Sequence, residues 1–342
     1  MIRRKILYLI GIIFIASSCI EEPQKHSNTK EGNFNALWDI VDTHYCFFEY
    51  KNIDWNQIYR EYHKQLEDID ENDQYKLFDL LAEMLAELKD GHVNLYSDFN
   101  ISSYDKFYKD SAANYYSSII SSDEYLGSEY KKTGGFIYEK LKKNDEIGYI
   151  YYGSFVKEIN DSHIKEIFNH FKNCKGLIID VRNNGGGDEN KAEQLVSYFI
   201  TKKTLVGYMQ LKNGPGHSDF SKAAPIYVSP HDSIHWDKPV TVLTNRSSYS
   251  ATNTFTSQIR QAPQAVTIGS WSGGGGGVPF SSELPNGWRV RLSTSLVYDT
   301  NMNHIENGIA PDIHVVISEE DKENNRDVVI DKAIETILNS SN

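Results

Sequence analysis

The serine at position 250 stands where a nucleophile could do chemistry. A short apolar run at residues 240–243 reads as a buried strand, and a polar turn then delivers Ser250 to the start of a helix. A hydroxyl at such a junction is exposed and lies near helical N–H groups, which favour negative charge. This placement suits a serine nucleophile, because its tetrahedral adduct carries an oxyanion. The competing interpretation is that Ser248 and Ser250 only cap the helix.

A histidine at position 92 lies at a second junction and is a candidate general base. An amphipathic helix is expected to end near Gly91, and residues 93–96 alternate like a strand. Loops between elements commonly carry function. The chain has eleven histidines, however, and a lone histidine is more often structural or exposed, so position alone does not assign His92 a role.

Two glycine runs follow expected strands. Residues 176–182 form a continuous apolar run ending in charge, typical of a buried strand, and Gly185–Gly187 come directly after it. This loop lacks the Gly-Lys-Ser/Thr ending of a P-loop and the Gly-x-Gly-x-x-Gly spacing, so nucleotide binding is the weaker interpretation. Backbone N–H groups that bind an oxyanion are chemically as natural. The second run, Gly273–Gly277, is either a close backbone approach or a flexible hairpin tip.

The elements that must position these residues fall into two parts. Apolar stripes at helical spacing predict helices across residues 33–90, with Asp54 and Asp73 as N-caps. Strand and helix patterns alternate from residue 145 onward. The sequence therefore predicts an α/β (α+β) protein with an N-terminal helical subdomain at 33–95 and a core at 145–342. Residues 96–144, rich in tyrosine and serine, are expected to form a cap over a cleft or a connecting segment.

The amino terminus reads as a targeting segment. Arg3, Arg4 and Lys5 precede an apolar stretch at residues 6–15, and small residues lead to Cys19. This pattern resembles a bacterial lipoprotein signal. It implies a signal peptide at 1–18, a lipidated Cys19 that anchors the protein in a bilayer, and a tether at 19–32. The expected location is the bacterial cell envelope, at the outer membrane, facing either the periplasm or the surface; an ordinary secretory signal is the alternative.

The composition limits the classes of binding partner and the state of the cysteines. The formal net charge of −12 argues against nucleic acid as a partner. Besides Cys19, only Cys46 and Cys174 occur, and both lie in apolar or helical contexts that favour two buried free thiols over a disulfide. No cofactor and no metal site are expected, and the oligomeric state is not predicted.

Four motifs in order resemble the tail-specific protease family of serine peptidases, in its tricorn-core and retinoid-binding-protein-like branch. They are Asp-Gly-His at 90–92, the strand and glycine loop at 179–187, Ser-Ala-Thr-Asn at 250–253, and the closing Glu-Asn-Gly-Ile-Ala-Pro-Asp-Ile at 306–313. The resemblance implies a crotonase-like ββα core. It also implies a peptide or unfolded protein substrate, with Ser250 as nucleophile and His92 as base. Glu306 would fix the imidazole tautomer, directly or through a hydroxyl, and the N–H groups of Gly186 and Ala251 would form the oxyanion hole.

The chain departs from that family pattern in several places. Residues 273–277 contain no lysine, so the serine–lysine dyad of the processing-protease branch is not expected. Gly91 stands where the tricorn-like branch has serine, and Asn253 replaces a glutamate. The chain also has little room for a peptide-binding insert. The alternative hypothesis is a catalytically silent protein that binds peptides or small apolar ligands in the same cleft.

Overall fold

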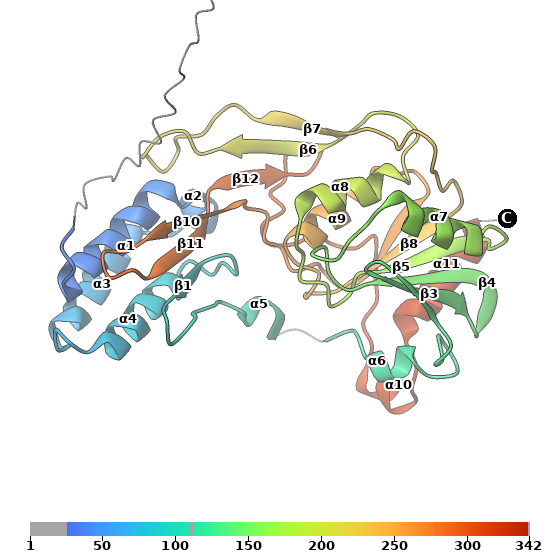
Figure 1. Ribbon diagram of the computed structural model, residues 1–342, viewed down its shortest axis with the longest axis horizontal. Helices are drawn as coiled ribbons and strands as arrows, with labels where there is room; N and C mark the ends of the chain where they lie inside the picture. The colour runs from blue at the N-terminus through green and yellow to red at the C-terminus, as the bar shows by residue number, and fades with distance from the viewer. Residues whose placement is uncertain (1–25, 110–112, 341–342) are drawn as a thin grey trace, which may run out of the picture.

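The computed structural model describes residues 26–109 and 113–340 (Figure 1). The predicted signal peptide and the lipidation site at Cys19 lie outside these ranges. Within them, no helix has the length and apolar character needed to cross a membrane. Cys46 and Cys174 are buried free thiols, as the sequence predicted.

A seven-stranded sheet forms the centre of the larger lobe. Its order is β13 (Ile313–His314), β9 (Ala265–Gly269), β8 (Val240–Thr244), β5 (Gly176–Asp180), β4 (Asn144–Tyr152), β3 (Phe136–Leu141) and β2 (Lys131–Thr133). The strands from β13 to β4 are parallel, and β3 and β2 add antiparallel. Every residue of β5 and β8 is buried, which is why these two strands read as continuous apolar runs.

Helices cover both faces of this sheet (Figure 1). One core contains the apolar sides of α7 (Asp161–His170), α8 (Glu189–Ser197) and α9 (Ala251–Ile259). The core on the opposite face contains α11 (Val328–Ser340) and the short α6 (Ser117–Ile120), and α10 (Glu319–Glu323) lies near by. This layering is a mixed α and β fold, consistent with the predicted crotonase-like core.

The smaller lobe is helical but is not built from one continuous segment. Its helices are α1 (Lys30–His44), α2 (Phe48–Lys51), α3 (Trp55–Glu67) and α4 (Gln74–Ala86). Asp54 and Asp73 cap α3 and α4 as predicted, each accepting a bond from a backbone N–H. The helices pack on a three-stranded sheet of β1 (Asn94–Tyr96), β11 (Arg289–Ser293) and β10 (Pro279–Glu283). Two of these strands come from residues 279–293, far along the chain, so the lobe extends beyond the predicted 33–95.

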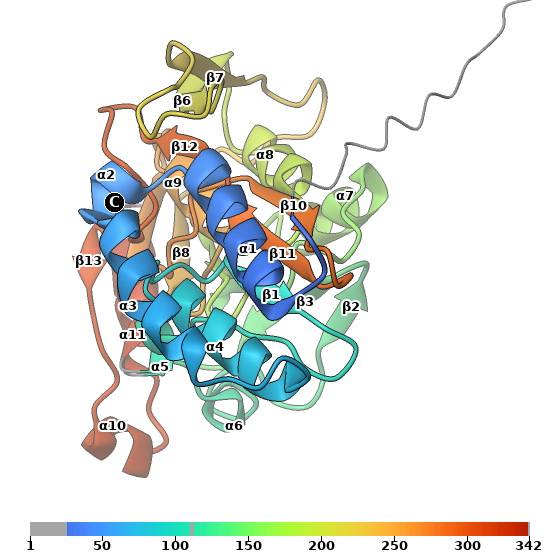
Figure 2. The same ribbon diagram turned by 90° about the vertical axis from the view of Figure 1, so that its left-hand side faces the viewer.

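Other element and segment boundaries also differ from the predicted ones. Helix α1 starts at Lys30, inside the predicted tether, because Thr29 accepts a bond from the Gly32 N–H as its N-cap. Strands β2 and β3 belong to the central sheet, so the predicted cap at 96–144 ends earlier; α5 (Lys106–Lys109) lies within it. A third sheet of β12 (Ser295–Tyr298), β6 (Thr204–Leu211) and β7 (Ala224–Val228) runs along one side of both lobes (Figures 1 and 2).

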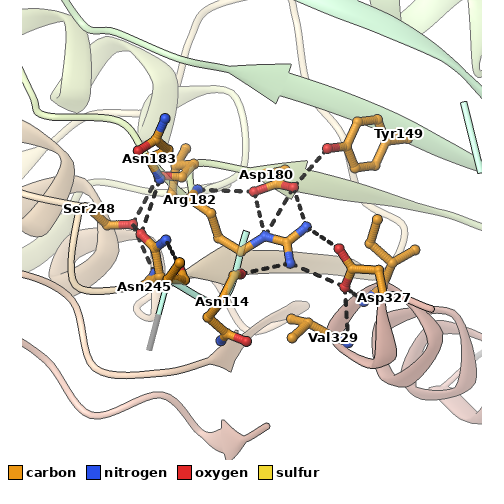
Figure 3. Close-up of polar contacts among 12 residues, drawn as sticks. Asn114, Tyr149, Asp180, Arg182, Asn183, Asn245, Ser248, Asp327 and Val329 are labelled. Carbon is orange, nitrogen blue, oxygen red and sulfur yellow. Dashed lines mark hydrogen bonds and ion pairs between the residues drawn. The ribbon is translucent and has the colours of Figure 1, made fainter. Parts of the chain in front are cut away.

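A buried ion cluster fixes the carboxyl end of β5 (Figure 3). The Arg182 guanidinium donates to Asp180 from Nε and from Nη2, the latter at 2.6 Å, and Nη1 donates to Asp327 at 3.1 Å. A further Nη1 bond reaches the carbonyl of Asn114, and Tyr149 donates to Asp180 at 2.7 Å. Because all three charged side chains are fully buried, each depends on its partners to compensate lost hydration.

Replacing Arg182 with methionine is expected to reduce the free energy of unfolding by about 3–5 kcal/mol, because two buried carboxylates lose their partner. Urea denaturation followed by circular dichroism measures this. The matched control is Arg260→Met, which removes a partly exposed pair with Asp312 and should cost less than ~1 kcal/mol. Equal losses for the two variants would contradict this account of the cluster.

Candidate active site

Ser250 sits at the sharp turn between β8 and α9. Its backbone has φ 57° and ψ −125°, an unusual conformation for a residue with a side chain. Although Ser250 is the N-cap residue of α9, its side chain makes no capping bond. Its Oγ lies instead 2.9 Å from Nε2 of His92. The structure therefore favours the nucleophile interpretation of Ser250 over the capping one.

Ser248 has a different role from that of Ser250. Its Oγ donates to the Val181 carbonyl at 2.9 Å and accepts from the Asn245 N–H at 3.1 Å. The Asn245 side chain in turn accepts from the Asn183 N–H (Figure 3). These bonds tie the turn that carries Ser250 to the loop after β5, which places the two predicted parts of the site side by side.

His92 reaches the site from the smaller lobe, between α4 and β1. Asp90 accepts from the His92 N–H at 2.8 Å and from the Ser293 hydroxyl at 3.0 Å, so the junction is held from both sides. The side chain is buried; its Nδ1 makes no hydrogen bond of good geometry within the described ranges, and the Gly277 backbone lies near enough to raise its pKa. Burial and the positive charges of Arg291 and Lys51 lower the pKa of His92 to about 4, against the raising effect of Asp90.

Glu306 forms no hydrogen bond or ion pair with His92 in the described structure. One carboxylate oxygen accepts from Lys51 Nζ at 2.7 Å, and the other accepts from the Gly276 N–H at 2.9 Å. Burial and the neighbouring Asp90 raise the pKa of Glu306, while Lys51 opposes them. A direct bond from Glu306 to the imidazole, one of the two predicted couplings, is therefore absent. Gly91 has no hydroxyl with which to join the two side chains.

The second glycine run packs under Ser250 and is not a flexible hairpin tip. The Gly274 carbonyl accepts from the Ser250 N–H, and the Gly275 N–H donates to the Glu306 carbonyl, both at 2.9 Å. A Cβ on Gly274 would lie 1.9 Å from that Glu306 carbonyl oxygen, so the approach requires glycine. Asn253 holds the same turn by donating to the Ile305 carbonyl at 2.9 Å.

The structure corrects one of the two predicted oxyanion-hole donors, Gly186. The Gly186 N–H donates to Asn184 Oδ1 at 2.9 Å, so it is not free to bind an oxyanion, and its assignment is corrected. Position 186 requires glycine for steric reasons, because a Cβ there would lie 2.8 Å from the Ser250 Cβ. The N–H groups of Gly187 and Ala251 form no hydrogen bond with any residue that the structure describes. Both residues adjoin Ser250, in the glycine loop and at the start of α9.

Comparisons with known proteins match this arrangement. The family model of peptidase family S41 matches residues 146–315, and that of the tricorn protease C1 domain matches residues 26–86. A crystal structure of a provisionally assigned peptidase from Parabacteroides merdae ATCC 43184 is 48% identical, with a TM-score of 0.86, and covers 91% of this chain and 98% of that one. The chain belongs to peptidase family S41.

The predicted membership of the tail-specific protease family is thus confirmed. Carboxy-terminal processing protease CtpB of Bacillus subtilis (strain 168) is 27% identical over 182 residues, or 53% of this chain and 36% of that protein. The match therefore spans well under half of that relative's length. Mature CPAF complexed with lactacystin is 13% identical, covers 91% of this chain and 99% of that one, and has a TM-score of 0.67, a likeness of fold. Together, the family and its named members indicate a serine-type peptidase.

The S41 site opens into a cleft of about 430 Å³ between the lobes. Ser250, His92 and the glycine loop line it, together with Val156, Tyr249 and Arg291. A larger hollow of about 930 Å³ lies outside this cleft, against α2, and neither Ser250 nor His92 lines it. Of these two hollows in the described structure, the smaller one is therefore the one that brings a ligand to the nucleophile.

Sequence reasoning missed three charged residues around this S41 site. Arg182 was visible only as the charge that ends an expected strand, and its pairing with Asp327 depends on a segment 145 positions later. Lys51 lies on α2, and Arg291 lies on a strand predicted only from alternation. Nothing near Lys51 or Arg291 in the chain signals the site, because each reaches it through contacts between distant segments.

The acid limit of activity is expected near pH 4. A histidine base works only when neutral, and a pKa lowered to about 4 keeps His92 neutral through most of the acidic range. Values of kcat/KM should therefore fall as the pH drops through about 4, and not near the ordinary histidine value of ~6.5. Initial rates from pH 3 to 8 measure this, and a midpoint near 6.5 would contradict it.

Unfolding must be measured alongside these rates. The unfolded chain binds a proton at His92 near pH ~6.5, whereas the folded chain does so only near 4. The contribution of His92 to stability is thus present above that unfolded value and is lost as the pH falls toward 4. Circular dichroism at each pH separates loss of the base from loss of the fold.

Proposed function

We propose that this chain is a serine peptidase that hydrolyses peptide bonds of peptides or unfolded proteins through Ser250 and His92. The observation that carries the proposal is the 2.9 Å approach of Ser250 Oγ to His92 Nε2, made by segments from different lobes. Nucleophile and base within hydrogen-bond reach are the signature of activated-serine catalysis. The membership of family S41 supports the same reaction.

The proposed reaction follows from the geometry. Ser250 Oγ attacks the scissile carbonyl carbon while its proton passes to His92 Nε2, which later protonates the leaving amine. The amide N–H groups of Ala251 and Gly187 stabilise the oxyanion; loss of one such donor typically costs ~10²–10³ in rate. Water then attacks the acyl-enzyme, with His92 again taking the proton, and releases the acid product.

Glu306 acts in this proposal as a positioning residue. Its carboxylate holds the Gly276 N–H, and the next residue, Gly277, lies near the imidazole, where its backbone acts to raise the pKa of His92. Glu306 therefore orients the ring through the glycine loop. Lys51 completes the arrangement by compensating the buried carboxylate.

A fluorophosphonate probe tests the proposed function. The probe phosphonylates an activated serine, and mass spectrometry of the digested protein should locate a single adduct on Ser250. Folded wild-type protein that neither takes up the probe nor cleaves denatured casein would overturn the proposal and would favour a catalytically silent binding protein.

We further propose that the protein is exported and held in the bacterial envelope by lipid on Cys19. The support is the basic, apolar and small-residue pattern that precedes this cysteine. Several acyl chains on one cysteine would anchor firmly, at ~0.8 kcal/mol per buried methylene. In a bacterial host, wild type should incorporate alkyne-palmitate and sediment with membranes, whereas Cys19→Ala should do neither. An equally labelled variant would contradict lipidation at this residue.

A further inference from the structure

Arg291 is a cation in the cleft to which the peptidase reaction gives no task. It lies on β11, where Val290 and Leu292 are buried against the helices of the smaller lobe. Because side chains alternate along a strand, Arg291 points to the opposite face, toward the cleft that it lines with Ser250 and His92. Its neighbour across the sheet is Asn94, two residues after His92.

The guanidinium of Arg291 is almost without partners. Its one hydrogen bond within the described ranges is a long contact of 3.4 Å from Nη1 to Asn94 Oδ1, and no carboxylate there pairs with it. Arg182, Arg260 and Arg326, by contrast, each pair with at least one carboxylate. A guanidinium has five N–H donors in a planar fork that matches a carboxylate, so Arg291 presents most of its binding capacity to the cleft.

Without a bound anion, the positive charge of Arg291 disfavours the proposed reaction. The charge of Arg291 lowers the pKa of His92, so it opposes the imidazolium that forms when Ser250 attacks. A negative group bound to Arg291 would remove that opposition at the moment of catalysis. Such a group has to come from outside the described chain, because none of its carboxylates approaches the guanidinium closely enough to pair with it.

We propose that Arg291 determines substrate specificity by binding a carboxylate of the peptide close to the scissile bond. This inference rests on the proposed function, and it adds the chemical class of substrate. The carboxylate belongs either to the peptide's own C-terminus or to an aspartate or glutamate side chain, and both present the same two oxygens to the fork.

The test uses synthetic fourteen-residue peptides in matched forms. Each sequence is made with a free C-terminal carboxylate and as the amide, and with glutamates intact or replaced by glutamine. Mass spectrometry gives the cleaved bond and the relative kcat/KM. Wild type is expected to prefer one charged form by about 10- to 100-fold, the size of a charge-assisted hydrogen-bond pair. Sensitivity to the amide identifies a C-terminal source, and sensitivity to glutamine identifies a side chain.

Two variants assign that preference to one residue. In Arg291→Leu the ratio between charged and neutral peptides should fall to about one. Arg289→Leu is the matched control, since Arg289 is exposed, lies on the same strand and stacks over Tyr96 outside the cleft lining; its ratio should equal that of wild type. The ratio is taken within each protein, so a change in folded fraction does not affect it.

The outcomes separate the two proposals. A wild type whose Ser250 takes up fluorophosphonate and which cleaves charged and neutral peptides equally would overturn the role of Arg291 and leave the peptidase function standing. Retention of the charge preference in Arg291→Leu would overturn it as well. A wild-type protein that shows neither labelling nor cleavage would instead overturn the proposed peptidase function itself.

Discussion

Replacing Ser250 with alanine is expected to remove nearly all peptide hydrolysis. Loss of a catalytic serine in a triad enzyme lowers kcat by ~10⁶, leaving only the rate that the oxyanion hole and binding provide. Stability should change little, because the Ser250 side chain makes no capping bond and alanine tolerates φ 57° no worse than serine does. The measurements are initial rates on a cleaved peptide and the melting temperature.

Ser247→Ala is the matched control for this change. Ser247 lies three residues earlier in the same turn, it does not line the cleft, and its hydroxyl forms no hydrogen bond within the described ranges. Its rate and melting temperature should match those of wild type. Continued cleavage by purified Ser250→Ala, above the level of a mock preparation, would place the nucleophile elsewhere.

Features set by short-range rules were predictable from the sequence. The strand at 240–243, the turn after it and the helix that begins at Ser250 follow from local pattern, and so do the caps Asp54 and Asp73. The junction at His92 was also visible, although the helix ends earlier, at Ala86, and the left-handed residue that follows it is Lys89, with φ 48°, and not Gly91. The fold class followed from alternation of these patterns.

Features that depend on distant segments were not predictable in this way. Strands β10 and β11 read as ordinary alternating strands, and nothing local shows that they pair with β1 and complete the smaller lobe. The partner of Glu306 is hidden for the same reason, because Lys51 comes from a four-residue helix 255 positions earlier. Gly186 lost its predicted role through one side chain, Asn184, whose rotamer the sequence does not specify.

Loss of the imidazole should be nearly as damaging as loss of the hydroxyl. His92→Ala is expected to lower kcat by ~10⁴–10⁶, since Ser250 would lose the one base that hydrogen-bonds it in the described part of the chain. The double variant with Ser250→Ala should be no worse than either change alone. His92→Gln, which fills more of the buried site, separates catalysis from packing. Rates and urea denaturation of all variants are the measurements.

The same variants test Lys51 as an alternative base, because some members of the resembling family use a serine–lysine dyad. Burial lowers the pKa of Lys51, but the charges of Asp90 and Glu306 outweigh it and raise that pKa, so its ammonium stays protonated and cannot accept the Ser250 proton. Lys51 is also held 2.7 Å from Glu306. A His92→Ala protein that is folded and still cleaves peptide at the wild-type rate would contradict this argument and require a different base.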